Sequence, residues 1–231
     1  MAKTSALPKF VQLSEMLIRE IAAGHISDGA RLPPEREMAD QLGLSVGTLR
    51  KSLANLAAKG LLERRHGSGN YVRHRSDVDS VYAMFRLELI EGGGLPTAQV
   101  LSAGRHPGGP DFSNCAQAGF RIRRLRLLGG VAAAVEEIWL ENARAGQLAA
   151  SELTDSLYRF YTRRLGFTVV RAEDRVGVDV VPQWATDRLA ASVGQPCGLV
   201  ERTAWDSDDQ IAEISRTWFD AGVARHVTRM K

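Results

Sequence analysis

LPPEREMADQLGLSVGTLRKSLANLAAKGLLERRHGSGNYV, residues 32–72, combines the signals of two short helices and a hairpin. Pro34 suits the first position of a helix, where its missing N–H group costs no hydrogen bond. That helix is expected to run to about Leu42. Gly43 then supplies a left-handed turn and Ser45 an N-cap for the next helix, so the spacing predicts a helix-turn-helix.

The second of these helices has one apolar face. Leu49, Leu53 and Leu56 recur at i, i+4 and i+7 and are expected to face the core, and Gly60 ends the helix. The polar residues expected on or near the opposite face, with Arg50 at its rim, are Thr48, Lys51, Ser52 and Asn55.

Two short strands are expected next, at about residues 61–64 and 70–73, joined by Arg65-His66-Gly67-Ser68-Gly69. A basic hairpin directly after a polar helix face is typical of a winged helix. Each part alone is also compatible with a purely structural role, as a packed helix pair or an ordinary turn. Their order, spacing and charge together predict a DNA-binding domain.

These motifs resemble the winged-helix domain of GntR-type bacterial transcription regulators. The resemblance covers roughly residues 8–73 and rests on Leu32–Ala39, Gly43–Arg50, Gly60–Leu62 and His66–Val72. It implies that Arg36 grips a phosphate or base, that Thr48 and Arg50 act from the second helix, and that the hairpin tip enters the minor groove. The residues expected to contact DNA are Arg36, Ser45, Thr48, Arg50, Lys51, His66 and Gly67.

The sequence departs from the usual GntR pattern at two places. Pro34 stands where Ser is usual, and Val46 and Gly47 stand where many relatives place Arg and Thr. A missing arginine removes a guanine contact worth ~1–3 kcal/mol of discrimination, so the operator sequence does not carry over.

Length and composition fit a soluble protein of two domains. The chain has 231 residues, of which 44% are apolar and 25% charged. No segment approaches the ~18 apolar residues of a membrane helix, and no secretory segment is found, so we expect a cytoplasmic protein with no membrane partner. Cys115 and Cys197 lack metal-ligand spacing and predict reduced thiols.

The basic charge is concentrated in the N-terminal third. Residues 1–75 contain 12 Lys and Arg against 7 Asp and Glu, whereas the remaining residues contain 18 against 20. A basic head on a slightly acidic second part fits a partner that is a polyanion.

A polar, aperiodic segment at residues 74–80 predicts a linker between a DNA-binding domain at 1–73 and a second domain at 81–231. Residues 81–90 are compatible with helix or strand. Strands are expected at residues 98–103, 120–128, 132–140, 167–179, 198–206 and 211–219, and helices from Thr154 or Ser156 to about Leu165 and from Pro182 to about Val193. This order predicts an α/β fold of the α+β type, with helices packed on a mainly antiparallel sheet.

Strand alternation places Phe120, Ile122, Arg124 and Arg126 on one face. A buried guanidinium needs an anion, so two arginines that continue an apolar face predict a protein carboxylate or a ligand beside them. A bulge near Arg123 would instead turn both arginines to solvent, and alternation alone leaves this alternative open.

Further polar residues accompany the two arginines. Glu136 falls among apolar residues of the next strand, although alternation does not choose between Glu136 and Glu137, and either could pair with a neighbouring arginine. Ser156 and Tyr158 lie at the start of a helix, where free N–H groups attract anions, although Ser156 is also an ordinary cap. Glu213 lies on the last strand.

Together these positions resemble the effector-binding UTRA domain of the HutC-type GntR subgroup, which has a chorismate-lyase-like fold, over about residues 80–225. The resemblance implies that one set of residues holds the anionic end of a small metabolite: Arg124, Arg126, Ser156 and Tyr158. It implies that Glu136 and Glu213 orient the rest of that metabolite.

The sequence therefore predicts a homodimeric transcription regulator, most simply a repressor released from its double-stranded DNA operator by an anionic metabolite such as a sugar phosphate, carboxylate or phosphonate. Two other functions stay open: a lyase-like enzyme that carries a DNA-binding head, and a DNA-binding protein without an effector. The sequence contains no catalytic constellation, and no cofactor is expected.

Overall fold

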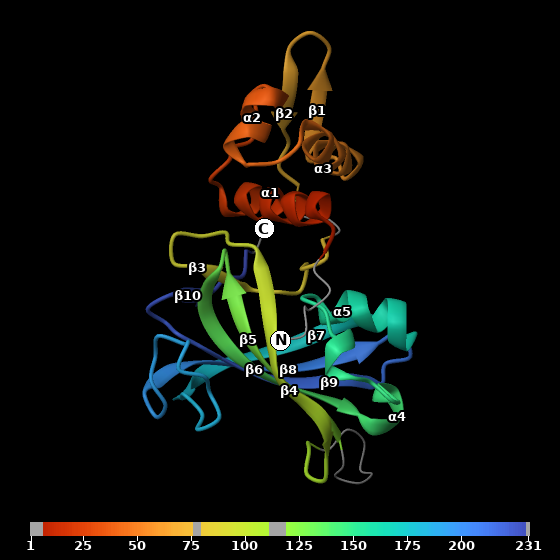
Figure 1. The fold of residues 1–231 in the computed structure, drawn as a ribbon, viewed down its shortest axis with the longest axis vertical. Coiled ribbons are helices and arrows are strands. Elements are labelled where there is room, and N and C mark those ends of the chain that lie inside the picture. The colour runs from red at the N-terminus through yellow and green to blue at the C-terminus, as the bar shows by residue number, and fades with distance from the viewer. Residues whose placement is uncertain (1–6, 76–79, 111–118, 230–231) are drawn as a thin grey trace. The chain divides into compact units, whose positions relative to one another are not determined.

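The computed structural model describes residues 7–75, 80–110 and 119–229. The chain divides into two compact units, one of residues 7–95 and one that begins at Pro96 (Figure 1). Most of the linker expected at 74–80 and the expected thiol of Cys115 lie outside the described residues, whereas Cys197 is a buried free thiol. Residues 81–95, assigned to the second domain from the sequence, belong to the first unit.

The first unit contains the three helices of a helix-turn-helix domain: α1 Lys9–Ala23, α2 Glu35–Gln41 and α3 Val46–Ala58. The expected turn between α2 and α3 is confirmed. Gly43 has a left-handed φ of 61°, and the Ser45 side chain accepts the N–H of Thr48 at 3.2 Å. The residues of α3 expected to face the core are at most 1% exposed: Leu49, Leu53 and Leu56.

One position on α3 corrects the sequence prediction. Ser52 is buried rather than on the polar face, and its hydroxyl lies 3.1 Å from the hydroxyl of Ser14 on α1. Because each hydroxyl has a hydrogen-bond partner, a polar residue is tolerated at this helix contact.

The hairpin also forms as expected, from β1 Leu62–Arg65 and β2 Gly69–Val72. The two strands are antiparallel, and an isolated bridge joins Arg31 to Tyr71. Gly67 at the tip has a φ of 69°, a left-handed conformation that favours glycine. The predicted winged helix is therefore confirmed.

Residues 80–95 fold against α1. The side chain of Arg19 is buried; its Nε donates to the carbonyl of Gly94 at 2.8 Å, and its Nη2 donates to that of Leu87 at 2.5 Å. Leu87 begins β3, Leu87–Leu89. The sequence-based domain boundary before residue 81 was placed by composition. Composition does not reveal hydrogen bonds between distant parts of the chain.

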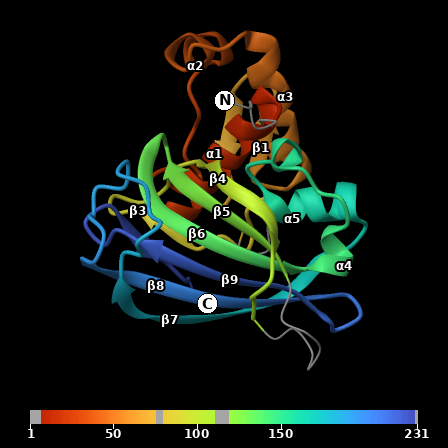
Figure 2. The same cartoon turned by 60° about the horizontal axis from the view of Figure 1, so that its bottom comes forward.

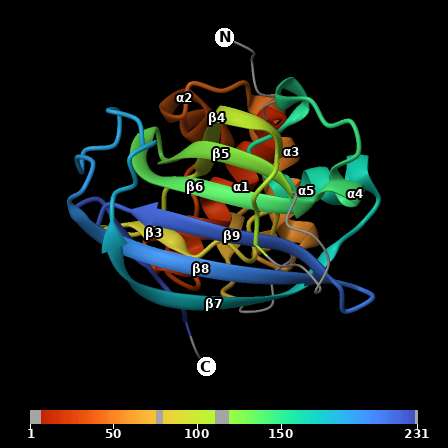
Figure 3. The same cartoon turned by 90° about the horizontal axis from the view of Figure 1, so that it is seen from below.

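The second unit is built on a six-stranded antiparallel sheet in the order β4-β5-β6-β9-β8-β7, with β4 and β7 at its edges (Figure 3). Its strands are β4 Pro96–His106, β5 Gly119–Leu128, β6 Val131–Glu141, β7 Val169–Val180, β8 Pro196–Asp206 and β9 Ile211–Phe219, and a short β10, Ala224–His226, follows. The predicted mixed fold with a mainly antiparallel sheet is confirmed.

Short helices lie along one side of this sheet (Figure 2). They are α4 Asn142–Ala145, η1 Ala150–Glu152, α5 Leu157–Phe160 and the π-helical turn η2 Tyr161–Leu165. The expected helix after Ser156 thus corresponds to α5 and η2. Gly166, with a φ of 80°, ends it as predicted.

The helix predicted from Pro182 to Val193 is wrong, because this segment forms successive turns. The N–H of Arg188 bonds the Thr186 hydroxyl at 3.3 Å, and the N–H of Ser192 bonds the side chain of Gln195 at 2.9 Å. Side chains thus bond N–H groups that a helix would use. Leu189 is buried as expected, but Val193 is 42% exposed.

Candidate functional site

The residues predicted to contact DNA lie in the first unit, on α2, on α3 and in the hairpin. Six of them are exposed and Thr48 is half-buried. The Ser45 hydroxyl lies 2.9 Å from that of Thr48, so these two hydroxyls already bond each other at the start of α3.

Arg50 projects from α3 with its side chain 67% exposed. Its Nε donates to Oε2 of Glu35 in the first turn of α2, at 2.6 Å. This exposed pair contributes little stability, but it ties the guanidinium to the preceding helix and leaves its other N–H groups available for a partner.

An arginine of the hairpin shows a contact that the sequence reasoning missed. The guanidinium of Arg65 lies 4.3 Å from the ring centre of Tyr71, and its Nε donates to Glu63 at 2.8 Å. Hydrogen bonds from Arg65 and from Arg73 hold the pKa of Glu63 below its ordinary value. His66 and Gly67 follow Arg65 at the tip of the hairpin, and both are exposed.

In the second unit, Arg124 and Arg126 lie on the buried face that alternation predicted. Arg124 is 2% exposed and Arg126 is 4% exposed. The alternative of a bulge near Arg123 that turns both arginines to solvent is therefore wrong. The pairing of β5 with β6 does shift its register, but only after Arg126. Both arginine side chains therefore keep their inward direction.

A single carboxylate, that of Glu136, pairs with both arginines. Its Oε2 lies 2.7 Å from Nη2 of Arg124 and 2.9 Å from Nη2 of Arg126. Burial by itself would raise the pKa of Glu136, but the two guanidinium groups hold it below the ordinary value. Taken alone, the two arginines and the ionised carboxylate carry one net positive charge, and the buried carboxyl group of Glu213 also interacts electrostatically with Arg124.

The neighbouring carboxylate, Glu137, points to the opposite face. Its Oε2 lies 2.6 Å from Nη2 of Arg123, and its Oε1 accepts the indole N–H of Trp139 at 3.1 Å. Alternation could not choose between Glu136 and Glu137, and the structure brings Glu136 to the arginine pair.

Asp155, next to the α5 cap Ser156, brings the start of α5 to the same arginines. The carbonyl of Asp155 accepts a hydrogen bond from Nη1 of Arg126 at 3.1 Å. The side chain of Asp155 accepts the N–H of Ala98 at 2.9 Å. The Ser156 hydroxyl caps α5 by accepting the N–H of Arg159 at 3.5 Å. The helix start is thus joined both to β4 and to the arginine cluster.

Glu213 is buried under two tyrosines. The Tyr161 hydroxyl donates to its Oε2 at 2.6 Å, and the Tyr158 hydroxyl donates to its Oε1 at 3.4 Å. Burial raises the pKa of Glu213 and of both tyrosines. Sequence reasoning found Tyr158 but missed Tyr161, although the spacing i, i+3 places both on one helix face.

A second ion pair extends this group of residues toward the sheet edge. Arg202 donates to Asp174 through Nε at 2.5 Å and through Nη2 at 2.7 Å, and it also bonds the Tyr158 side chain. Burial opposes the charged form of Asp174, but the bonds from Arg202 hold its pKa far below the ordinary value. These contacts form two neighbouring groups, one around Glu136 and one around Glu213, and the two groups are related by the electrostatic interaction between Arg124 and Glu213.

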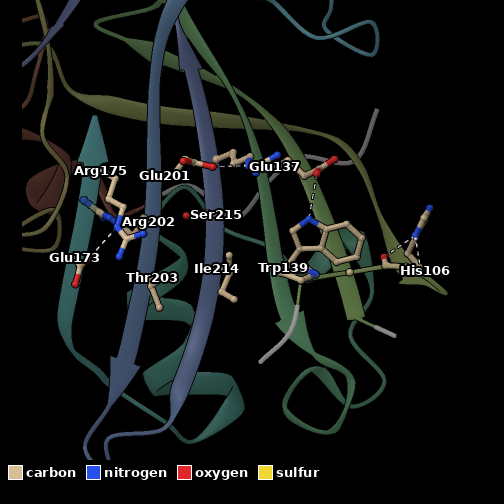
Figure 4. A pocket seen from close by; sticks show the side chains of 14 residues that line it. His106, Glu137, Trp139, Glu173, Arg175, Glu201, Arg202, Thr203, Ile214 and Ser215 are labelled. Atoms are coloured by element: carbon tan, nitrogen blue, oxygen red, sulfur yellow. Dashed lines mark hydrogen bonds and ion pairs between the residues drawn. The ribbon is translucent and has the colours of Figure 1, made fainter. Parts of the chain in front are cut away.

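The opposite face of the sheet contains an open hollow of about 520 Å³ (Figure 4). Its side chains are paired: Glu201 with Arg216 at 2.9 Å, and Glu173 with Arg175 at 3.0 Å. The hollow contains none of the six predicted effector residues, which lie on the covered face. Among the described residues no cluster of three or more His, Cys, Asp or Glu suits a metal ion, and no helix is long and apolar enough to span a membrane.

Comparison with known proteins agrees with both units. The description "Bacterial regulatory proteins, gntR family" matches residues 10–72, and "UTRA domain" matches residues 93–222. The HTH-type transcriptional regulator SmoD of Agrobacterium fabrum is 49% identical over 228 residues, which is 98% of this chain and 97% of that protein. The HTH-type transcriptional repressor NagR of Bacillus subtilis is 26% identical over 88% of this chain and 86% of its own length.

Solved structures share the fold. The possible transcriptional regulator YydK from Bacillus subtilis has a TM-score of 0.56 at 17% identity and covers 97% of this chain and 100% of that one. PhnF from Mycobacterium smegmatis has a TM-score of 0.51 at 19% identity over 91% and 96%. The chain therefore belongs to the gntR family of bacterial regulatory proteins: it is a DNA-binding transcription regulator of the HutC type, with a UTRA domain after its winged helix in the sequence.

Proposed function

We propose that this regulator is a cytoplasmic homodimeric repressor that leaves its operator when a small anionic metabolite binds the second unit. The observation that carries the proposal is the buried pair of guanidinium groups of Arg124 and Arg126, which share the carboxylate of Glu136. An anion that joins or replaces this carboxylate gains strong charge-assisted hydrogen bonds from both guanidinium groups.

Each predicted effector residue receives a role in this proposal. The anionic end is held by Arg124, Arg126, Ser156 and Tyr158. Glu136 and Glu213 orient the hydroxyl or amine groups of the rest. Because the arginine side chains are only 3% and 5% exposed and bond Glu136, the anion must share or displace that carboxylate. Sugar phosphates, carboxylates and phosphonates all meet these requirements.

On DNA, Arg36 and Lys51 contact phosphates or groove edges. From the start and the outer face of α3, Ser45, Thr48 and Arg50 enter the major groove. His66 and Gly67 enter the minor groove from the exposed hairpin tip. The names of two relatives support repression as the outcome: NagR is a repressor, and the histidine utilization repressor of Pseudomonas aeruginosa is 23% identical over 86% of this chain and 82% of its own length.

A ligand screen followed by an operator-release assay tests the proposal. Sugar phosphates, carboxylates and phosphonates are first ranked by thermal shift, where a ligand at 100 times its dissociation constant stabilises by about 2.7 kcal/mol. The best ligand is then titrated into the protein–operator complex. Release supports the proposal, whereas tighter operator binding or turnover of the ligand would replace it with activation or with an enzymatic function.

A further inference from the structure

The two tyrosines that bond Glu213 do so with unequal strength. The Tyr161 hydroxyl lies 2.6 Å from Oε2, within the ordinary range of a bond between two oxygens. The Tyr158 hydroxyl lies 3.4 Å from Oε1, beyond that range, and the hydroxyl of Ser215 lies 3.3 Å from the same oxygen. Tyr161 therefore holds Glu213, whereas the hydrogen of Tyr158 can turn to another acceptor at little cost.

Arg202 determines which way the hydroxyl of Tyr158 points. Arg202 bonds the Tyr158 side chain, and a guanidinium group can only donate. The phenolic oxygen of Tyr158 therefore accepts this bond, and its own hydrogen must point away from Arg202. Burial raises the pKa of Tyr158, so the hydroxyl keeps this hydrogen and stays a donor.

Asp174 holds Arg202 in this position. Asp174 on β7 lies directly opposite Arg202 on β8, and its carboxylate accepts Nε at 2.5 Å and Nη2 at 2.7 Å. Nε2 of His226 lies 3.4 Å from the same carboxylate, on Oδ2. The carboxylate of Asp174 matches the charge of Arg202. In this respect Arg202 differs from Arg124 and Arg126, which share one carboxylate.

We propose that Arg202 is a positioning residue for the effector: held by Asp174, it orients the Tyr158 hydroxyl so that the hydrogen bonds the anionic end of the ligand instead of Glu213. This role rests on the proposed function, in which Tyr158 holds that anion. Glu213 interacts electrostatically with both Arg202 and Arg124, so the weakly bonded hydroxyl lies close to the arginine pair. A donor that is oriented in advance loses less freedom when the ligand binds, and binding is tighter.

A double-mutant cycle with inorganic phosphate as the probe tests this role. The pair variant, Arg202→Met with Asp174→Asn, removes both charges together, so that no buried charge is left unpaired. Isothermal titration measures the phosphate affinity of wild type, of Tyr158→Phe, of the pair variant and of the variant with all three changes. Tyr158→Phe and the pair variant are each expected to weaken binding by at least about tenfold, the effect of losing a hydrogen bond to a charged group.

The variant with all three changes is expected to bind phosphate no more weakly than Tyr158→Phe alone. Both sets of changes remove the same hydrogen bond, so their effects do not add. General damage to the site would weaken binding in the Tyr158→Phe background as well. If thermal unfolding shows that the pair variant is unfolded, the same cycle is measured with Arg202→Lys. The lysine keeps the charge beside Asp174 but lacks the planar fork that reaches both partners.

The matched control removes an ion pair from the other face of the same strand. Glu201 on β8 pairs with Arg216 on β9 at 2.9 Å, so Glu201→Gln with Arg216→Met should leave phosphate affinity unchanged.

Two results would overturn the role of Arg202 and leave the proposed function intact. The first is a pair variant that binds phosphate as tightly as wild type. The second is a triple variant that binds clearly more weakly than Tyr158→Phe, because Arg202 would then act on the anion independently of the tyrosine. A wild type that binds no phosphate would overturn the proposed effector site and this role together.

Discussion

The carboxylate of Glu136 lies 2.7 Å from Nη2 of Arg124, in a place where both groups are less than a tenth exposed. The same carboxylate also bonds Arg126. The protein therefore already supplies an anion to the arginines that an effector would need, and binding becomes a competition between two anions for the same donors.

Replacing Glu136 by Gln should tighten the binding of inorganic phosphate by at least about tenfold, which corresponds to about 1.4 kcal/mol. The amide removes the competing charge, while phosphate has no other groups for Glu136 to orient. The same variant should be less stable without ligand, because two buried guanidinium groups lose their counter-ion. Isothermal titration with phosphate measures the first effect and thermal unfolding the second.

An isosteric change outside the cluster provides the control. Glu137→Gln alters the neighbouring carboxylate, which bonds Arg123 on the other face, and should leave phosphate affinity unchanged. Equal or weaker phosphate binding by Glu136→Gln would show that this carboxylate does not compete with the effector.

Replacing both arginines by Met should destabilise the second unit by about 3–5 kcal/mol, because Glu136 is left buried and unpaired. Adding Glu136→Leu should restore most of that stability, since the whole charged cluster is then gone. The triple variant should still bind operator but no longer release it with ligand. Operator-release titrations of the triple variant and of wild type test this prediction. Release of the triple variant at the same ligand concentration as wild type would show that the effector does not bind at this cluster.

Stability should depend on pH in opposite ways through Glu213 and Glu136. Burial raises the pKa of Glu213, so its favourable contribution is present below the unfolded pKa and is lost as pH rises through the folded one. Despite burial, Arg124 and Arg126 lower the pKa of Glu136, whose contribution is present above the unfolded pKa and is lost as pH falls through the folded one.

Relative to wild type, Glu213→Gln should therefore become more stable as pH rises above about 4.5, whereas Glu136→Gln should become more stable as pH falls below about 4.5. Urea unfolding followed by tryptophan fluorescence measures this for the second unit alone. All four tryptophans lie there: Trp139, Trp184, Trp205 and Trp218. Parallel pH profiles for the two variants would contradict the assigned shifts.

Local patterns predicted the elements and the direction of the buried side chains. Ser45 and Gly43 act as the sequence indicates because capping and left-handed turns depend on a few adjacent residues. Alternation likewise placed Arg124 and Arg126 on the covered face, since the side-chain period of a strand is fixed by its backbone.

Contacts between distant segments could not be predicted in the same way. The choice of Glu136 over Glu137, the bond from Tyr161 to Glu213 and the pairing of Arg202 with Asp174 all depend on strand register and helix docking. The wrong helix at residues 182–193 has a similar cause. Its apolar spacing suited a helix, but side-chain acceptors bond its N–H groups.

Replacing Gly67 by Val should weaken operator binding without unfolding the first unit. The left-handed φ of 69° is strained for a β-branched residue, and the added side chain would stand between the hairpin tip and the groove. Fluorescence anisotropy with labelled operator measures the loss, and the control is Gly130→Val, which places the same side chain at a left-handed glycine in the turn between β5 and β6 of the second unit. If Gly67→Val binds the operator as tightly as wild type, the hairpin does not contact DNA.

Substitutions of Arg50 distinguish a contact with a DNA base from a contact that depends only on positive charge. Arg50→Ala should abolish specific operator binding while the fold stays intact, because the side chain is 67% exposed and pairs only with the half-buried Glu35 among the contacts described. Arg50→Lys keeps the charge but loses the planar fork that bonds guanine with two N–H groups.

If Arg50 reads a base, the Lys variant should bind nonspecific DNA like wild type and lose the preference for operator, at a cost of about 1–3 kcal/mol. If Arg50 contacts only phosphate, the Lys variant should keep its operator preference, and only the Ala variant should bind more weakly to every sequence, with a shallower dependence on salt. Anisotropy titrations of both variants on operator and scrambled DNA, at two salt concentrations, distinguish these outcomes.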